Sequence, residues 1–320
     1  MNNKIAIVIP DHNDPFLIQT IKSAVANAKY PENLYFSVFS TNNDFDQEEL
    51  KSILNVNIVQ ASSDAPLGTG ISRLVAAYSR VHDCEYHLQI DTHTIFAKNW
   101  DDLLLNYYKS ISSEYGDDIV ISAATQLWSV NDGVITIPLG EDRIVDPYNF
   151  ELGNIANGQR MKLFVHRFPN GGGKRVQSSS DSDWVWGEKD YVEQHTLIGH
   201  FIFAKDRFFT EFIHDPLLGW YGDQEGLAVR SWTRGYRFFA IKTVPVFTQR
   251  KTESDIANHP RDHRHELNKI KKESGRTSHR YATILNGELL GYWGAKDMES
   301  LKAWEQANGV SFIGYLNGND

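Results

Sequence analysis

Two polar stretches of the sequence place side chains that can bind a metal ion directly after apolar runs. Residues 11–14, DHND, follow KIAIVIP, and Asp91 and His93 follow YHLQI. In an extended segment, residues two apart point to the same side, so Asp91 and His93 can reach one cation while Thr92 points away. A carboxylate with an imidazole suits Mn²⁺, and suits Mg²⁺ less well because that ion prefers oxygen ligands. The simpler alternative is that Asp91 caps the next turn and His93 is exposed.

The elements that position these side chains follow from the hydrophobic pattern. Apolar runs predict strands at 4–9, 33–40, 56–61 and 86–91. Amphipathic patterns predict helices at 15–29 and 68–82. This alternation predicts an α/β fold, a mostly parallel sheet covered by helices on both faces. Ligands of such sheets bind beyond the carboxyl ends of the strands, which is where both polar stretches lie.

The pattern changes in the second half of the chain. Periodicity fades from about residue 125 to 196, which contains FPNGGGKRVQSSSDSD, and we expect a flexible loop or lid there. Order returns as a strand and short helix at 196–209, then a helix and strand at 222–241. We expect a main domain at 1–255 and a small C-terminal extension, in part helical, at 256–320.

Composition narrows the class of protein. With 320 residues and 41% apolar content, the chain can bury one sizeable core. A net charge of −9 disfavours nucleic acids and anionic membranes as partners, and favours a small-molecule or protein substrate. No run approaches the roughly 18–20 apolar residues of a membrane span, and the N-terminus lacks a signal-peptide pattern. The lack of both patterns, together with a single cysteine, Cys84, predicts a cytoplasmic protein.

Three stretches, in this order along the chain, resemble the nucleotide-sugar glycosyltransferases of the GT-A fold. The opening IVIPDHNDPFLIQTIKSAVANAKYP resembles their first strand, nucleotide loop and helix. The closest resemblance is to the cytoplasmic N-acetylglucosaminyltransferases that modify hydroxyproline on the protein Skp1, and a weaker one is to the polypeptide N-acetylgalactosaminyltransferases. The residues that match the other two motifs are Asp91, Thr92, His93, Phe96, Trp100 and Asp101, then Gly222, Asp223, Gln224, Arg230, Trp232 and Thr233.

The resemblance implies transfer of a sugar, N-acetylglucosamine or a related hexose, from a UDP-sugar to a hydroxyl acceptor, with retention of the anomeric configuration. Mn²⁺ or Mg²⁺ on Asp91 and His93 would help the diphosphate to leave. The acceptor can be a protein, a glycan or a small molecule, and a modified nucleobase of DNA is less favoured by the charge. A catalytically silent nucleotide-sugar-binding protein stays open. A phosphoesterase is weaker, because no second carboxylate-rich cluster is evident.

The resemblance also assigns roles at the nucleotide. It places Pro10, His12, Asn13 and Asp14 at the uracil and ribose, where the Asn13 amide and the Asp14 carboxylate suit a base edge and a hydroxyl group. An ordinary turn after a strand is the alternative. Arg73, in the helix opened by GTGIS, would lie near the nucleotide, and the helix start favours phosphate. A solvated arginine is the alternative there.

The sugar and the acceptor would lie at the later motif. The resemblance gives Trp220 and Tyr221 stacking on a ring, and gives Asp223 and Gln224 the catalytic contacts with hydroxyl groups. Asp223 as a simple N-terminal helix acid stays open. Glu225 is a less favoured candidate for the same role.

One part of the family pattern is missing. Many relatives carry a further histidine ligand downstream of the glycine-acid motif, and here Thr248 of VPVFTQRK lies near that place. Asp91, His93, two phosphate oxygens and water can complete the metal shell instead. Histidines that could replace the missing ligand are His259, His263 and His265. Basic residues that could bind the diphosphate are Arg250, Lys251, Arg261 and Arg264.

Overall fold

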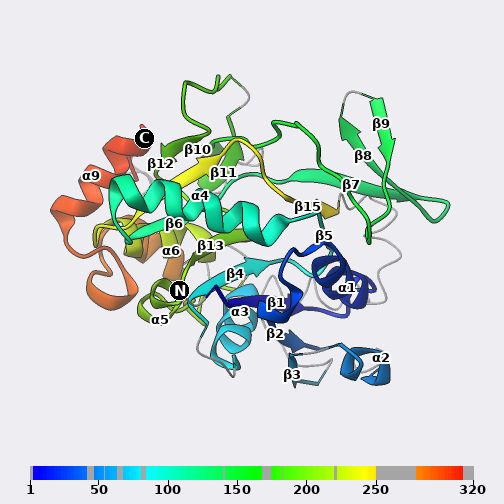
Figure 1. Ribbon diagram of the computed structural model, residues 1–320. Coiled ribbons are helices and arrows are strands. Elements are labelled where there is room, and N and C mark those ends of the chain that lie inside the picture. The colour runs from blue at the N-terminus through cyan, green and yellow to red at the C-terminus, as the bar shows by residue number, and fades with distance from the viewer. Residues whose placement is uncertain are drawn as a thin grey trace.

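A central sheet of eight strands forms the frame of the described part of the protein (Figure 1). The computed structural model describes residues 3–41, 47–53, 55–62, 68–80, 84–139, 141–167, 174–181, 183–219, 222–249 and 279–312. In sheet order the strands are β12 (Tyr191–Gln194), β14 (Arg237–Ile241), β6 (Ile119–Ile121), β13 (Phe201–Lys205), β4 (Tyr86–Ile90), β1 (Ile5–Asp11), β2 (Leu34–Ser40) and β3 (Val56–Gln60).

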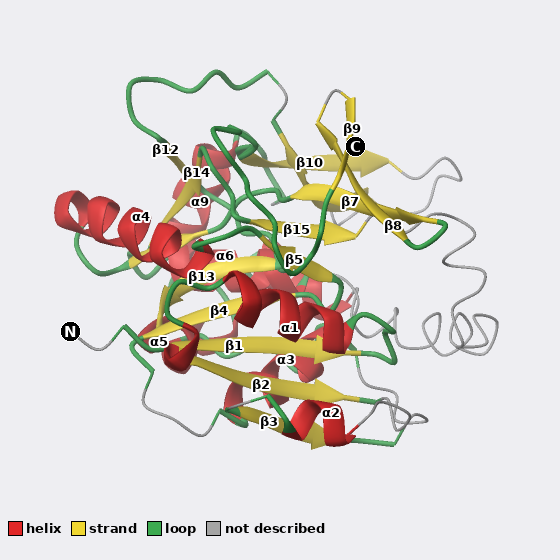
Figure 2. Cartoon of the chain, turned by 45° about the vertical axis from the view of Figure 1, so that its right-hand side comes forward, coloured by secondary structure: helices red, strands yellow, loops and turns green. Residues whose placement is uncertain are grey.

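Most of these strands run in one direction. β1 pairs in parallel with β2 and β4, β2 pairs in parallel with β3, and β6 pairs in parallel with β14. Figure 2 shows β1, β2 and β3 side by side with their carboxyl ends at one edge. Only β13 and β12 are reversed among the described strands of this sheet. The predicted α/β fold with a mostly parallel sheet is confirmed.

Helices cover both faces of the sheet, as predicted. Successive side chains of a strand point to opposite faces. Ile5, Ile7 and Ile9 of β1 accordingly pack with α1 and α4, whereas Val8 packs with α3. The helices are α1 (Leu17–Asn27), α2 (Gln47–Lys51), α3 (Thr69–Tyr78), α4 (Trp100–Tyr115), α5 (Asp206–Glu211) and α6 (Asp223–Trp232), with a 3₁₀ turn η1 at Pro31–Asn33.

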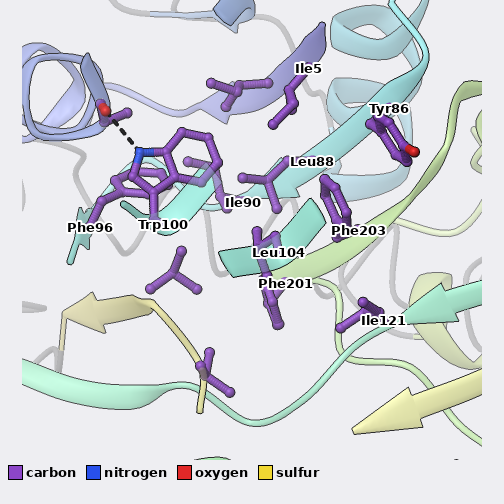
Figure 3. Close-up of a cluster of buried hydrophobic side chains, with 14 of the residues drawn as sticks. Ile5, Tyr86, Leu88, Ile90, Phe96, Trp100, Leu104, Ile121, Phe201 and Phe203 are labelled. Carbon is purple, nitrogen blue, oxygen red and sulfur yellow. Dashed lines mark hydrogen bonds between the residues drawn. The ribbon is translucent and has the colours of Figure 1, made fainter. Parts of the chain in front are cut away.

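The core beside β4 contains both aromatic residues of the first motif. Phe96 and Trp100 are fully buried, with their ring centroids 4.7 Å apart (Figure 3). The Trp100 indole N–H donates to the carbonyl of Ala24 in α1 at 2.8 Å. The neighbouring Asp101 carboxylate accepts the backbone N–H groups of Lys29 and Tyr30. These residues therefore fix α4 against the sheet.

Strands occupy much of the stretch from 125 to 196. A second sheet has the order β5 (Thr94–Phe96), β15 (Val246–Gln249), β7 (Gln126–Asn131), β8 (Val134–Leu139) and β9 (Glu141–Ile144). β10 (Met161–Arg167) and β11 (Lys174–Ser180) pair as an antiparallel hairpin. The fading periodicity gave no sign of these strands, because short strands with one solvated face carry a weak apolar signal. Residues 168–173 and 182 lie outside the described residues, and the lid stays a prediction.

The C-terminal part is helical in the described residues, with helical backbone at 279–285, η2 (Gly291–Trp293) and α9 (Met298–Asn308). At the start of α9, Asp297 accepts the Ser300 N–H at 2.8 Å in a capping box. The domain boundary at residue 255 stays a prediction, since residues 250–278 lie outside the described part. Among the residues described, no helix is long and apolar enough to cross a membrane.

A buried histidine in β4 makes the fold sensitive to acid. His87 is fully buried, and its ring stacks on Phe209 with centroids 3.7 Å apart. Burial lowers the pKa of His87 from 6.5 to about 4, and nearby Arg80 adds to this against the opposing effect of Asp206. Between these two values the unfolded chain binds a proton that the folded protein does not, so stability falls as pH drops. We expect this histidine to cost roughly 2 kcal/mol of stability by pH 5.

Chemical denaturation at pH 7.5 and pH 5 measures this effect. His87→Phe should flatten the pH dependence by about that amount, while His279→Phe, at an exposed histidine, should leave it unchanged. Equal pH dependence in His87→Phe and the wild type contradicts the prediction.

Candidate active site

Polar side chains from the carboxyl ends of β1 and β4 meet at one edge of the sheet. Asp91 directly follows β4, and the His93 Nδ1 lies 3.0 Å from the Asp14 Oδ2 in the loop after β1. Thr92, between them, is buried and donates its hydroxyl to the Pro10 carbonyl at 2.7 Å. Asp91 and His93 thus differ from Thr92 in their surroundings, but residues 92 and 93 form a bend and not the extended segment that the sequence predicts.

Asp14 is held rigidly where it meets His93. Its Oδ1 accepts the Phe16 N–H at 3.1 Å, and its own N–H donates to the Asp11 Oδ1 at 2.9 Å. The side chains of Asp14 and His93 are only 6% and 14% exposed. A ring nitrogen bonded to a carboxylate fixes the orientation of the imidazole and leaves Nε2 as the nitrogen for a metal ion. The structure thus brings Asp14 to His93, and its expected contact with a ribose stays a prediction.

Arg73 joins the two sequence motifs. Its guanidinium makes an ion pair with Asp223 through Nη1, and Nη2 lies 3.2 Å from the Asp91 Oδ1. Burial alone would raise the pKa of the Asp91 carboxyl. The effect of Arg73, followed by those of His93 and His200, outweighs burial and holds this pKa below its usual range. Arg73 is 5% exposed, so the solvated alternative is excluded.

The start of α3 is closed by a neighbouring loop. The N–H groups of Thr69 and Gly70 donate to the carbonyls of Gly219 and Leu218 at 2.9 and 3.1 Å. These donors are therefore engaged with protein carbonyls, unlike the phosphate-binding helix start that the sequence suggests. His12, in the loop after β1, reaches the same helix, with its Nε2 3.1 Å from the Ser72 hydroxyl. The neighbouring Asn13 adopts a left-handed backbone with φ 57°.

The start of α6 carries the second motif. The Gln224 Oε1 accepts the Gly199 N–H at 2.9 Å, and its Nε2 lies 3.0 Å from Glu225 and 3.2 Å from Ser178. Both ends of this amide contact protein, and the expected catalytic contact of Gln224 with a hydroxyl group stays a prediction. Burial raises the pKa of Glu225 to about 7. Trp220 and Tyr221 lie outside the described residues.

The donor set fits a divalent cation only in part. Asp91 and His93 offer a carboxylate oxygen and Nε2, which suit Mn²⁺, and the remaining positions would fall to phosphate oxygens and water. In the described ranges, no group of three His, Cys, Asp or Glu side chains is placed to hold a metal. Thr248 of β15 pairs with Thr94 of β5, and the next residue, Gln249, donates its N–H to the His93 carbonyl. His259, His263 and His265, with Arg250, Lys251, Arg261 and Arg264, lie outside the described residues.

Sequence reasoning missed His200. β13 pairs antiparallel with β4, with Phe201 opposite Ile90, so His200 comes to the level of Asp91. Burial lowers the pKa of His200 to about 4, against the opposing effect of Asp91. The signal in the sequence was a histidine directly before an apolar run, but the pairing of that run with β4 could not be predicted.

The fold is that of an α/β protein, and the cluster marks a candidate ligand site at the carboxyl ends of its parallel strands. The chain belongs to the glycosyltransferase (GlcNAc) family, whose model matches residues 42–308. The resemblance seen in the motifs and the expected enzyme class, a glycosyltransferase, are confirmed. The match begins after β1 and its loop, so it does not cover Pro10 to Asp14, and it ends with the last residue of α9.

Solved structures of TarS from S. aureus are similar in fold. TarS 1–349 in complex with UDP-GlcNAc is 13% identical, over 98% of this chain and 81% of that one, with a TM-score of 0.47. TarS 1–349 in complex with UDP is 13% identical, and the match covers 95% of this chain and 78% of that one, with a TM-score of 0.46. No curated protein matches this chain in sequence. Similarity at this level assigns no role to individual residues.

Proposed function

We propose that this protein transfers GlcNAc from UDP-GlcNAc to a hydroxyl group with the help of a divalent cation. The observation that carries the proposal is the Asp91–His93 pair at the end of β4, in a chain of the GlcNAc glycosyltransferase family. Asp14 orients His93, and Arg73 orients Asp91. A cation bound there would act as a Lewis acid on the departing diphosphate.

The remaining residues of the cluster suit the sugar side of the reaction. Arg73 holds Asp223 beside Asp91, so a carboxylate that can bind sugar hydroxyl groups lies next to the diphosphate position. The ion pair keeps the Asp223 carboxylate oriented. We propose retention of configuration, as in the families that the motifs resemble, in which a leaving-phosphate oxygen takes the acceptor proton and no protein base is required.

Turnover of a donor panel tests the proposal. We expect UDP release from UDP-GlcNAc with Mn²⁺ to exceed that from UDP-GalNAc and UDP-glucose by at least about tenfold, since a missing or misplaced polar contact is costly. An Asp91→Ala, His93→Ala double variant should release UDP at the background rate. NMR of the first-formed linkage should show the anomeric configuration of the donor.

The outcomes separate the candidate functions. UDP binding in calorimetry without turnover, equal in wild type and double variant, favours the catalytically silent protein that Thr248, in place of the family histidine, suggests. An inverted linkage overturns retention and makes the buried Glu225 the first candidate for a base. For the acceptor we propose a protein, glycan or small-molecule hydroxyl, with a nucleobase of DNA disfavoured by the net charge of −9.

A further inference from the structure

The C-terminal segment, residues 279–312, packs along α6, and α9 lies beside that helix (Figure 1). Its apolar side chains share one core with residues of α6 and of the loop before it. The buried members of this core are Leu163, Leu218, Val229, Tyr281, Ile284, Leu285, Ala295, Leu301, Trp304 and Phe312. The family model also extends to residue 308, so the segment belongs to the part of the chain that the family shares.

Tyr281 packs directly on Gly222, the N-cap residue that precedes α6. Gly222 has a left-handed backbone with φ 79° and is followed by Asp223. A Cβ at Gly222 would lie 2.6 Å from Cγ and 2.8 Å from Cε2 of the Tyr281 ring, closer than any side chain can tolerate. Tyr281 is 9% exposed. The ring therefore rests against the backbone that places Asp223 in the site.

Arg280 holds the loop that precedes α6. Its Nε donates to the Asp215 Oδ2 at 2.9 Å, and Asp215 is 2% exposed. The carbonyls of Leu218 and Gly219 in the same loop accept the first N–H groups of α3. The loop is thus fixed by the C-terminal segment and by the helix that carries Arg73 to Asp223.

The far end of the segment is attached as well. The Lys296 N–H donates to the Thr233 hydroxyl at 3.0 Å, at the carboxyl end of α6. The Trp304 indole N–H donates to the His195 carbonyl at 2.7 Å. The segment is therefore bonded at the carboxyl end of α6 and packs against its amino end, which resists rotation or sliding of the helix over the core.

We propose that the first part of this segment, residues 279–296, forms a brace that sets the position of Asp223, and that Tyr281 is a positioning residue for glycosyl transfer. The brace acts through the Gly222 backbone, and among the residues that the structure describes no hydrogen bond joins it to the loop after β1. Loss of the ring should therefore disturb the sugar side of the site and spare nucleotide binding. The kinetic consequence rests on the proposed function, whereas the structural consequence does not.

Three variants test the brace. We expect Tyr281→Ala to lower kcat for UDP-GlcNAc about 10- to 100-fold, because a misplacement on the order of 1 Å is enough for such a loss. The Kd for UDP should stay within about threefold, since uniform binding is untouched. Tyr281→Phe should restore kcat. Leu301→Ala, in the same core but on α9, is the control that lowers Tm without lowering kcat.

Hydrogen exchange measures the effect of the brace on the start of α6 and does not require turnover. The Gly226 N–H donates to the Gly222 carbonyl at 2.7 Å in the first turn of α6. Amides of residues 222–226 should exchange at least about tenfold faster in Tyr281→Ala than in Leu301→Ala, as local opening predicts. Arg280→Gln, which leaves no cavity, should show a smaller change in the same direction and replaces Tyr281→Ala if that variant does not fold.

The proposal is overturned if Tyr281→Ala and Arg280→Gln match Leu301→Ala in kcat and in exchange at 222–226. If the wild-type protein fails to turn over UDP-GlcNAc, faster exchange at 222–226 in Tyr281→Ala than in Leu301→Ala still supports the brace, and the missing turnover counts only against the proposed function. A loss of kcat that Tyr281→Phe does not restore overturns the role of the ring.

Discussion

Arg73→Met is expected to lower the free energy of unfolding by about 3–5 kcal/mol and to abolish turnover, because it leaves the buried Asp223 carboxylate and the partly buried Asp91 carboxylate without their counter-charge. Asp223 and Asp91 both face the same guanidinium, and their side chains are 8% and 29% exposed. Chemical denaturation and UDP release measure the two effects. The stability and the turnover of Arg73→Lys should fall between those of Arg73→Met and the wild type, since one ammonium group cannot span both carboxylates.

The matched control is Arg207→Met. Arg207 also pairs with two carboxylates, Asp118 and Glu211, but its side chain is 55% exposed. Surface pairs of this kind contribute about 0–1 kcal/mol. Gly199→Ala tests the same network from the other side, because a Cβ there would lie 2.8 Å from Cζ of Arg73. Similar losses in Arg73→Met and Arg207→Met contradict the bridging role.

Asp14→Ala is expected to weaken Mn²⁺ binding by about 10- to 100-fold, because carboxylates that orient a ligating imidazole contribute on that scale. The reason lies in the 3.0 Å contact from the Asp14 Oδ2 to the His93 Nδ1. Without it the ring can rotate and its Nε2 becomes less basic. Titration of Mn²⁺ in the presence of UDP, followed by electron paramagnetic resonance, measures the affinity without any turnover.

Asp146→Ala is the control for Asp14→Ala. Asp146 makes the same kind of turn, with its Oδ1 accepting the Tyr148 N–H at 2.9 Å, but it is exposed on the surface. The Asp146→Ala variant should leave the affinity for Mn²⁺ unchanged. Asp14→Asn keeps an acceptor oxygen for His93 and should lose less affinity than Asp14→Ala. Identical affinities for the Asp14 and Asp146 variants refute the orienting role.

The first half of the fold could be predicted because its signals are local. Buried parallel strands are continuous apolar runs, and β1, β2, β3 and β4 lie where the runs predict them. The place of β13 between β4 and β6 depends instead on packing between segments far apart in the chain. His200 was missed for this reason, since nothing local pairs its strand with β4.

The site residues also divide into those that local sequence signals predict and those whose contacts depend on the tertiary structure. Asp91 and His93 were visible as two residues of one motif at a predicted strand end. The partners that the structure gives them, Arg73 and Asp14, were known as candidates but were expected at the nucleotide. Side-chain ion pairs between loops depend on tertiary geometry, which residue spacing does not encode. Thr248 was identified as a departure from the family pattern, and the structure places its strand directly beside His93.

The order of strands in the central sheet also bears on synthesis of the chain. β1 to β4 emerge from the ribosome before β13, and one edge of β4 is covered only when β13 follows. Gln89 and the carbonyl of Gly199 that it binds are 110 positions apart. During that interval β4 presents unpaired backbone groups and apolar side chains, an edge that other nascent chains can join. Productive folding of this enzyme therefore depends on how well that edge is protected until β13 arrives.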